Sequence, residues 1–219
     1  PAFGASLRRL SDAPKSGDTA QERHEYSQLQ AFNRDSSLIW QNQNGSFVVR
    51  DVATGNLVRT LPNDINAPRW NPANGDEIIF FDSNDTGSGN RTVVLEKINV
   101  RSGERNSIMT LPAIYERVSP AISWEEMSHD GKWLGAYLYR TDGDMTFVAI
   151  NALTGALGAE LRLNGDLYGA ACVADPAGPN WVAASPSGKY TVIQWNADGT
   201  GRCRGVELYD IATGAYVGH

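Results

Sequence analysis

The residues best suited to chemistry are few and scattered along this 219-residue sequence. His24 is one of only three histidines, and imidazole is the side chain whose charge changes nearest to neutral pH. Tyr26 follows closely, while Arg69 and Glu126 belong to later stretches. Brought to one opening, these groups would bind a polar ligand such as an acidic sugar, with His24 as the first candidate for acid–base work.

The composition excludes several other classes of function. The formal charge is −6, from 19 Lys and Arg against 25 Asp and Glu, so no basic surface for nucleic acid is expected. No apolar run approaches the roughly 20 residues of a membrane-spanning helix. The Gly-x-Ser-x-Gly turn of hydrolases, the phosphate-binding loop, the dinucleotide fingerprint and the His-Glu-x-x-His zinc motif are all missing from the sequence.

Two turn signatures recur in constant order along the chain. The strands between these turns must position a site formed by His24, Tyr26, Arg69 and Glu126. The first begins with Asn or Ser, and its copies are Asn33–Ser37, Asn71–Gly75, Ser128–Lys132 and Ser185–Lys189. The second begins with Asp or Asn and ends in Gly, at Asp51–Gly55, Asn99–Gly103, Asn151–Gly155 and Asp210–Gly214. In the second signature, the leading side chain accepts backbone hydrogen bonds and the glycine supplies a positive φ. Extended runs flank every copy, so each unit reads strand, turn, strand, loop, strand, turn, strand.

Four antiparallel strands per roughly 50 residues are typical of one blade of a β-propeller. The sequence therefore predicts an all-β propeller with about four blades, as part of a larger ring of seven, with a closed four-bladed ring as the alternative. We expect a lead-in strand and loop over 1–25 and blades over 26–62, 63–112, 113–163 and 164–219. The last blade is expected to stop inside its final strand, with further blades of the chain missing.

Ligand-binding candidates follow from the strand that leads each unit, because that strand lines a propeller's central channel. Counting back from the first turn, these strands are 28–32, 66–70, 123–127 and 180–184. Their first and third positions face the same side. The candidates on and beside them are Gln28, Gln30, Asn66, Ser123, Glu125, Glu126 and Asn180. The alternative is that these polar side chains only meet water in the channel.

The units resemble the repeats of TolB-type and WD-like propellers, most clearly at Ser185–Lys189 and Leu208–Gly214. The same repeat occurs in propeller domains of prolyl-oligopeptidase-type peptidases and in propeller polysaccharide lyases of the oligogalacturonate and ulvan type. The stretches Phe3–Asp12 and His24–Gln28 are also similar to lyase-like propellers. That likeness implies His24 or Tyr26 as acid or base and Arg69 as the group that neutralises the substrate carboxylate.

Three functions therefore remain open. The first is a TolB-like binding or scaffold module that holds a ligand or protein partner at the channel mouth. The second is β-elimination on a uronic-acid polysaccharide. The third is the propeller half of a peptidase. Whether the protein is an enzyme stays undecided.

The cysteines and two loops complete the predictions. Cys172 and Cys203 are the only cysteines, and either a disulfide or two reduced thiols fits the sequence. The repeat type and the paired cysteines favour a periplasmic or extracellular protein. The loops 82–87 and 196–201 place oxygen side chains as calcium loops do, but the required glutamate is missing. Hairpin loops are the better interpretation, and no metal or cofactor is expected.

Overall fold

The computed structural model describes residues 9–10, 22–24, 29–84, 92–119, 127–168 and 178–219. These residues form four sheets of four strands each. The first two sheets contain β1 (Glu22–Arg23), β2 (Leu38–Gln43), β3 (Ser46–Asp51), β4 (Leu57–Thr60), β5 (Ile65–Asn71), β6 (Asn74–Asn84), β7 (Thr92–Asn99) and β8 (Arg105–Thr110). The last two contain β9 (Tyr115–Val118), β10 (Trp133–Arg140), β11 (Met145–Asn151), β12 (Leu161–Arg162), β13 (Pro179–Ala184), β14 (Tyr190–Trp195), β15 (Val206–Asp210) and β16 (Tyr216–Gly218).

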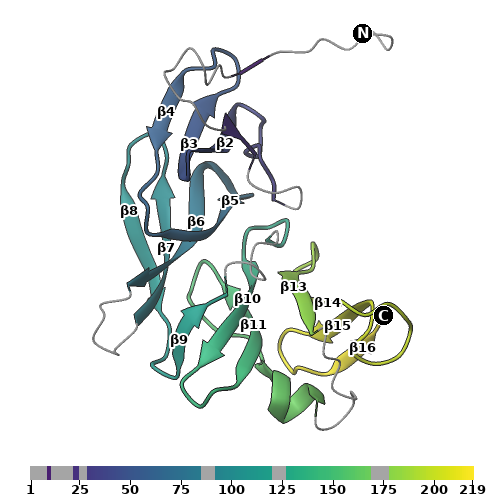
Figure 1. Ribbon diagram of the computed structural model, residues 1–219. Coiled ribbons are helices and arrows are strands. Elements are labelled where there is room, and N and C mark those ends of the chain that lie inside the picture. Colours follow the sequence, from purple (N-terminus) through teal and green to yellow (C-terminus); the bar gives the residue numbers. More distant parts are fainter. Residues whose placement is uncertain (1–8, 11–21, 25–28, 85–91, 120–126, 169–177) are drawn as a thin grey trace, which may run out of the picture.

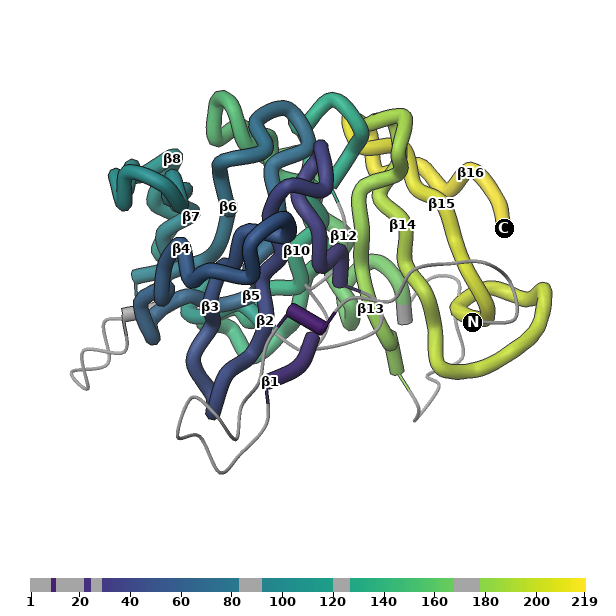
Figure 2. Tube along the Cα trace, turned by 90° about the horizontal axis from the view of Figure 1, so that it is seen from above, coloured from purple at the N-terminus to yellow at the C-terminus, as the bar shows by residue number. Residues whose placement is uncertain are grey.

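Strands follow one another in sequence order within each sheet, and every neighbouring pair is antiparallel. The four sheets succeed one another along an open arc, as the colours from purple to yellow show (Figures 1 and 2). This arrangement confirms the prediction of an all-β propeller with four four-stranded antiparallel blades. The alternative of a closed four-bladed ring is wrong, because the arc is open.

The Asp/Asn turns form as the sequence predicts. The side chain of Asp51 accepts hydrogen bonds from the backbone N and the hydroxyl of Thr54 at 2.7 and 2.8 Å, and Asp210 does the same for Thr213 at 2.9 and 2.9 Å. Asn99 and Asn151 cap the same positions of their turns through their amide oxygens. The closing glycines have φ values of 77°, 82°, 74° and 71°, which other residues rarely adopt.

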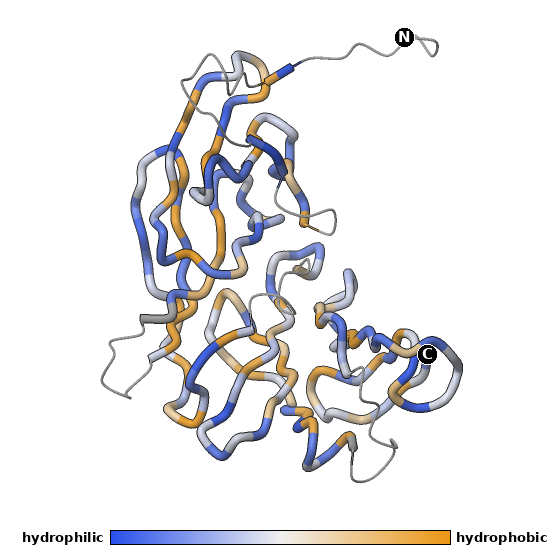
Figure 3. Tube along the Cα trace, in the orientation of Figure 1, coloured by the Kyte–Doolittle hydropathy of each residue, from blue (hydrophilic) through white to orange (hydrophobic). Residues whose placement is uncertain are grey.

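Three hydrophobic clusters hold the arc together, and each lies between two consecutive sheets. Trp40, Ile78 and Phe80 belong to the cluster between the first and second sheets. Phe81 and Leu138 belong to the second cluster, which joins the second and third sheets. Figure 3 gives the hydropathy along each strand, and successive residues of a strand face opposite sides of its sheet. Since both faces of the middle sheets are covered, apolar side chains occupy both sets of positions there.

The third cluster joins the third and fourth sheets through Tyr137, Phe147, Ile193 and Trp195. No cluster among the described residues joins the fourth sheet to the first. Val192, which precedes Ile193 and faces the other way, is accordingly only half-buried. One face of the fourth sheet therefore has no other described sheet packed on it.

The chain departs from the sequence prediction in two ways. The first described strands of the first and third sheets, β1 at Glu22–Arg23 and β9 at Tyr115–Val118, lie earlier than the leading strands predicted over 28–32 and 123–127. A fixed count back from the turn failed in these two sheets because β1 and β9 end well before Asn33 and Ser128, whereas β5 and β13 run directly into their turns. The second departure is a π-helical turn over Leu163–Tyr168, which follows β12 and packs Leu163 and Leu167 into the third cluster.

Candidate functional site

The site is built on the Asn/Ser turn that follows the first strand of each sheet. In three of these turns the leading side chain accepts a hydrogen bond from the backbone amide five residues later. Asn33 accepts from Leu38 at 2.9 Å, Ser128 from Trp133 at 2.9 Å, and Ser185 from Tyr190 at 3.1 Å. This bond fixes where the second strand begins, and it gives the three turns a common shape.

Neighbouring turns contact one another across the sheets. The side-chain amide of Asn33 donates to the carbonyl of Gly75 at 3.0 Å, and the backbone amide of His129 donates to the carbonyl of Pro186 at 3.0 Å. Arg34 also reaches the second turn, where its Nη1 lies 3.4 Å from the carbonyl oxygen of Ala73. The first turn is thus bonded to the second, and the third to the fourth.

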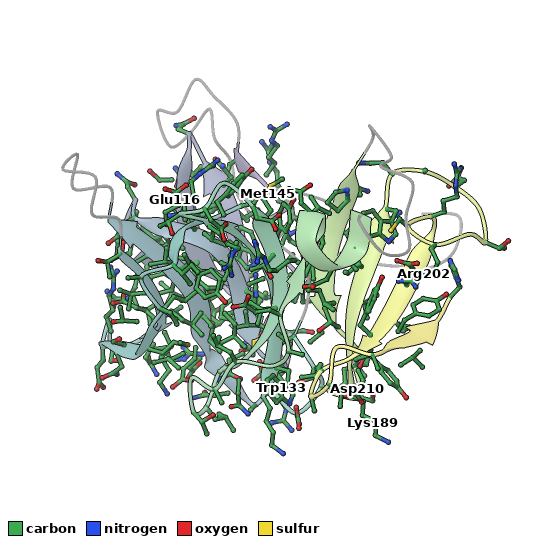
Figure 4. All side chains as sticks on the ribbon, turned by 90° about the horizontal axis from the view of Figure 1, so that it is seen from below. Glu116, Trp133, Met145, Lys189, Arg202 and Asp210 are labelled. Carbon is green, nitrogen blue, oxygen red and sulfur yellow. The ribbon has the colours of Figure 1, made fainter. Side chains whose placement is uncertain are left out.

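A pocket of about 710 Å³ opens beside these turns, and we call it the central pocket. Its walls are supplied by all four sheets: Leu29, Gln30, Phe32, Asn33, Arg34 and Ser36 from the first, Trp70 and Pro72 from the second, Met127 and His129 from the third, and Trp181, Ala183, Ala184, Pro186 and Val192 from the fourth. In Figure 4, Trp133, Lys189 and Asp210 lie at one end of the sheets, and Glu116 and Met145 lie at the other. The turns of the central pocket belong to the end marked by Lys189.

The lining of the central pocket is mainly apolar and aromatic. Among the described residues that line it, the charged or titratable ones are Arg34 and His129, both exposed, and none is an aspartate or glutamate. No ion pair of either residue occurs in the part of the chain that the structure describes. Over the residues described here, the pocket therefore presents Arg34 and His129 among otherwise uncharged side chains.

The acidic residues directly after Arg34 and His129 in the sequence, Asp35 and Asp130, are bonded within their own turns. Asp35 accepts from the hydroxyl and the backbone amide of Ser37 at 2.7 and 3.1 Å, and Asp130 accepts from the hydroxyl of Ser128 at 2.7 Å. These hydrogen bonds, from Ser37 and from Ser128, lower the pKa of Asp35 and Asp130 respectively. Neither carboxylate lines the central pocket.

The structure places one of the predicted ligand-binding residues, Gln30, in the central pocket. Asn66 donates to the carbonyl of Asp64 at 3.2 Å, and Asn180 donates to the side chain of Gln194 at 3.2 Å. Both amides therefore have hydrogen-bond partners that are not lining residues of the central pocket. Four further predictions, at Gln28, Ser123, Glu125 and Glu126, lie outside the described residues, as does the catalytic candidate Tyr26.

The other two catalytic candidates contact different parts of the arc. His24 packs edge-on against Trp40, with 5.5 Å between ring centroids, beside the first cluster. Arg69 is only 3% exposed; its Nη1 lies 3.4 Å from the carbonyl of Gly135, and its guanidinium lies 5.9 Å from the ring of Phe81. Neither residue lines the central pocket. Their catalytic roles stay predictions.

The sequence reasoning passed over the residues that give the central pocket its character. Arg34, Pro72, His129 and Pro186 all belong to the Asn/Ser turn signatures, but none of them was among the predicted site residues. The sequence did contain a signal for this site. The turn signature recurs once per unit, so its four copies must meet where the sheets converge.

Cys203 is disulfide-bonded, which decides between the two alternatives left open by the sequence. The only other cysteine in the chain, Cys172, lies outside the described residues. Among the residues that the structure describes, no group of three or more His, Cys, Asp and Glu could hold a metal ion. The same part of the chain holds no helix long and apolar enough to cross a lipid bilayer.

Known proteins resemble this chain in structure alone. No model of a known protein family matches it. No curated protein matches it either. A similar solved structure is the β-propeller domain of the trilobed protease from Pyrococcus furiosus, with 11% identity, a TM-score of 0.47, and coverage of 83% of this chain and 53% of that one.

Two further structures are similar to the same degree. Sqt1 from Saccharomyces cerevisiae has 13% identity and a TM-score of 0.48, over 86% of this chain and 48% of that one. The Cps50 (Swd1) propeller domain from Myceliophteria thermophila has 12% identity and a TM-score of 0.48, over 93% of this chain and 76% of that one. The chain spans about half the length of the first of these, the trilobed protease domain. Such likenesses carry nothing about activity, and the fold assignment rests on the sheets themselves.

Proposed function

We propose that this chain is a propeller-type binding module that holds a segment of a protein partner in the central pocket. The observation that carries the proposal is the composition of the pocket: four sheets converge on it, and most of its lining is apolar or aromatic. Pockets of a few hundred cubic ångströms with apolar walls and a few polar groups are typical ligand sites. This proposal keeps the first of the three functions that the sequence left open.

The lining supports binding more than catalysis. The part of the lining that the structure describes holds one histidine and no aspartate, glutamate, cysteine or tyrosine. Acid–base or nucleophilic catalysis needs a second group to orient or activate the first. His129 has no such partner among the lining residues that the structure describes.

The two enzymatic alternatives gain no support from the described residues. A lyase would need His24 and Arg69 to face one substrate, and these residues pack in different sheet junctions. A peptidase would need a hydrolase segment that this sequence does not contain. Both functions remain alternatives to the binding function.

We also propose that the protein works in an oxidising compartment, either the periplasm or the extracellular space. The disulfide bond of Cys203 supports this, because such bonds persist mainly outside the reducing cytosol. Alkylation of free thiols in the protein taken directly from its source, followed by mass spectrometry, tests the point. Two alkylated cysteines in the native material would contradict it.

Selection from a displayed library of random peptides tests the binding function. The wild-type chain is compared with Ala183→Tyr, which places a ring in the central pocket, and with the matched control Leu153→Ser. Leu153 is 61% exposed and lies outside the pocket. We expect peptides to be enriched by the wild type and by the control and to be lost with Ala183→Tyr. If Ala183→Tyr enriches the same peptides as the wild type, or if the wild type enriches no peptide, the binding function is refuted. Circular dichroism of each variant shows that it is folded.

A further inference from the structure

We infer that the segment held in the central pocket carries an acidic side chain beside an aromatic or aliphatic one. This inference rests on the proposed binding function and adds the chemistry of the partner. It follows from three features of the pocket: its charge, its walls and its size.

The charge is the first feature. The chain as a whole is acidic, with 25 Asp and Glu against 19 Lys and Arg, yet the described residues that line the central pocket include Arg34 and His129 and no carboxylate. Asp35 and Asp130 are next to these residues in sequence, but their oxygens accept hydrogen bonds from Ser37, Ser128 and Lys132. A partner carboxylate would therefore complement the pocket better than a basic or neutral group.

Arg34 is suited to hold that carboxylate. Its Nη1 lies 3.4 Å from the carbonyl of Ala73, which ties the side chain to the second turn. A guanidinium has five N–H donors, so several remain for a ligand, and two of them can bind a carboxylate in parallel. His129 belongs to the third turn, so basic groups reach the pocket from two different sheets.

The walls are the second feature. Trp70, Trp181 and Phe32 supply aromatic surface, and Pro72, Pro186, Met127 and Val192 are among the apolar residues beside them. The indole N–H of Trp70 already donates to the carbonyl of Ala31 at 2.9 Å. A sugar needs many hydrogen-bond partners. Five of the described lining residues have polar side chains, and one of them, Asn33, already bonds with Leu38 and Gly75. A peptide side chain of apolar character is satisfied by burial alone. The walls therefore favour a peptide over a uronic-acid oligosaccharide.

The size is the third feature. A pocket of about 710 Å³ is in the range that encloses most of a small ligand. It has room for a short peptide turn with two adjacent side chains in place. One of these would lie against the aromatic wall while the other reaches Arg34.

The test sequences the peptides enriched by the wild type, by Arg34→Glu and by Arg204→Glu. Arg204 is exposed, lies outside the central pocket and serves as the matched control. We expect the wild type and the control to enrich peptides with an acidic residue next to an apolar one, and Arg34→Glu to lose that acidic preference. For one enriched peptide, changing its acid to the amide should weaken binding to the wild type about tenfold, since a charged pair is worth roughly 1.4 kcal/mol. The same change should have little effect on binding to Arg34→Glu.

The outcomes separate this inference from the binding function. The wild type could enrich peptides that lack an acidic preference, while Ala183→Tyr enriches none. This result would overturn the inference about the acidic side chain and leave the binding function intact. Titration of the wild type with a trigalacturonate oligosaccharide serves as the other arm. If the wild type binds this sugar, Arg34→Glu abolishes that binding and no peptide is enriched, then both the inference and the peptide-binding function are wrong.

Discussion

The carboxylate of Glu207 accepts a hydrogen bond from the indole nitrogen of Trp195 at 2.7 Å, although Glu207 is entirely buried. The same carboxylate also accepts from the hydroxyl of Tyr209 at 2.7 Å, from Nε of Arg202 at 2.9 Å and from the backbone amide of Cys203 at 2.9 Å. Four donors thus satisfy both oxygens of a buried charge. This arrangement joins β14, β15 and the loop between them beside the disulfide-bonded Cys203.

Replacing Glu207 by glutamine should destabilise the fourth sheet. The side-chain shape is kept, but one oxygen becomes an NH₂ group that faces two donors and accepts from neither. We expect the free energy of unfolding to fall by about 1–3 kcal/mol, the cost of leaving buried donors unsatisfied. Urea denaturation followed by tryptophan fluorescence measures it. Glu104→Gln, at an exposed position, is the control, and an equal effect of the two changes would contradict the role of Glu207.

The two faces of β14 are buried to different extents, so shortening a side chain on one face should lower the free energy of unfolding more than on the other. Ile193 is fully buried between the third and fourth sheets, while Val192 is half-buried and lines the central pocket. Ile193→Ala should lower the free energy of unfolding by about 2–4 kcal/mol, and Val192→Ala by about 1 kcal/mol or less. Denaturant titration of both variants tests this. Equal losses would mean that both faces of the fourth sheet are covered alike.

Gly155 and Gly143 differ in surroundings but share a positive φ, of 74° and 83°. A methyl group added at Gly155 would lie 2.8 Å from Cβ of Met109, in the second sheet, whereas one added at Gly143 would meet nothing within 4 Å. Gly143→Ala should therefore cost only the backbone strain, about 1 kcal/mol, and Gly155→Ala should cost more because it also pushes two sheets apart. The difference in melting temperature between the two variants measures the contact. Equal melting temperatures of the two variants would show that the turn at Gly155 does not contact the second sheet.

The aspartate turns predict a loss of stability in acid. Hydrogen bonds from Thr54 and Thr213 lower the pKa of Asp51 and Asp210 below the ordinary value of 3.8. Above that value both the folded and unfolded chains are ionised there, and the stabilisation is fully present. As the pH falls below it, the unfolded chain takes up the proton first, so stability is lost.

The double variant Asp51→Asn and Asp210→Asn should show a smaller loss of stability between neutral and acid pH than the wild type. Asparagine already fills the same turn position at Asn99 and Asn151, so the turns themselves should persist. Thermal melts over a series of pH values compare the two proteins. A wild type whose pH dependence matches that of the double variant would contradict this assignment.

The repeat could be predicted from the sequence because its signals are local. A side chain such as Asp210 caps amides two and three residues away, and the glycine that closes the turn needs a positive φ, so composition and spacing alone identify the turn. Alternating burial along strands such as β14 is local in the same sense. From these local rules the strand order, the antiparallel pairing and the number of sheets all follow.

The tertiary structure alone decided which residues meet. Arg34 and His129 are brought to one pocket, and Arg69, a candidate catalytic residue, is buried between two sheets. The disulfide bond of Cys203 and the early start of β9 were likewise beyond sequence reasoning. The physical reason is that contacts between sheets depend on how strands twist and on how long each connection is. Neither property is recorded in the few residues of a turn.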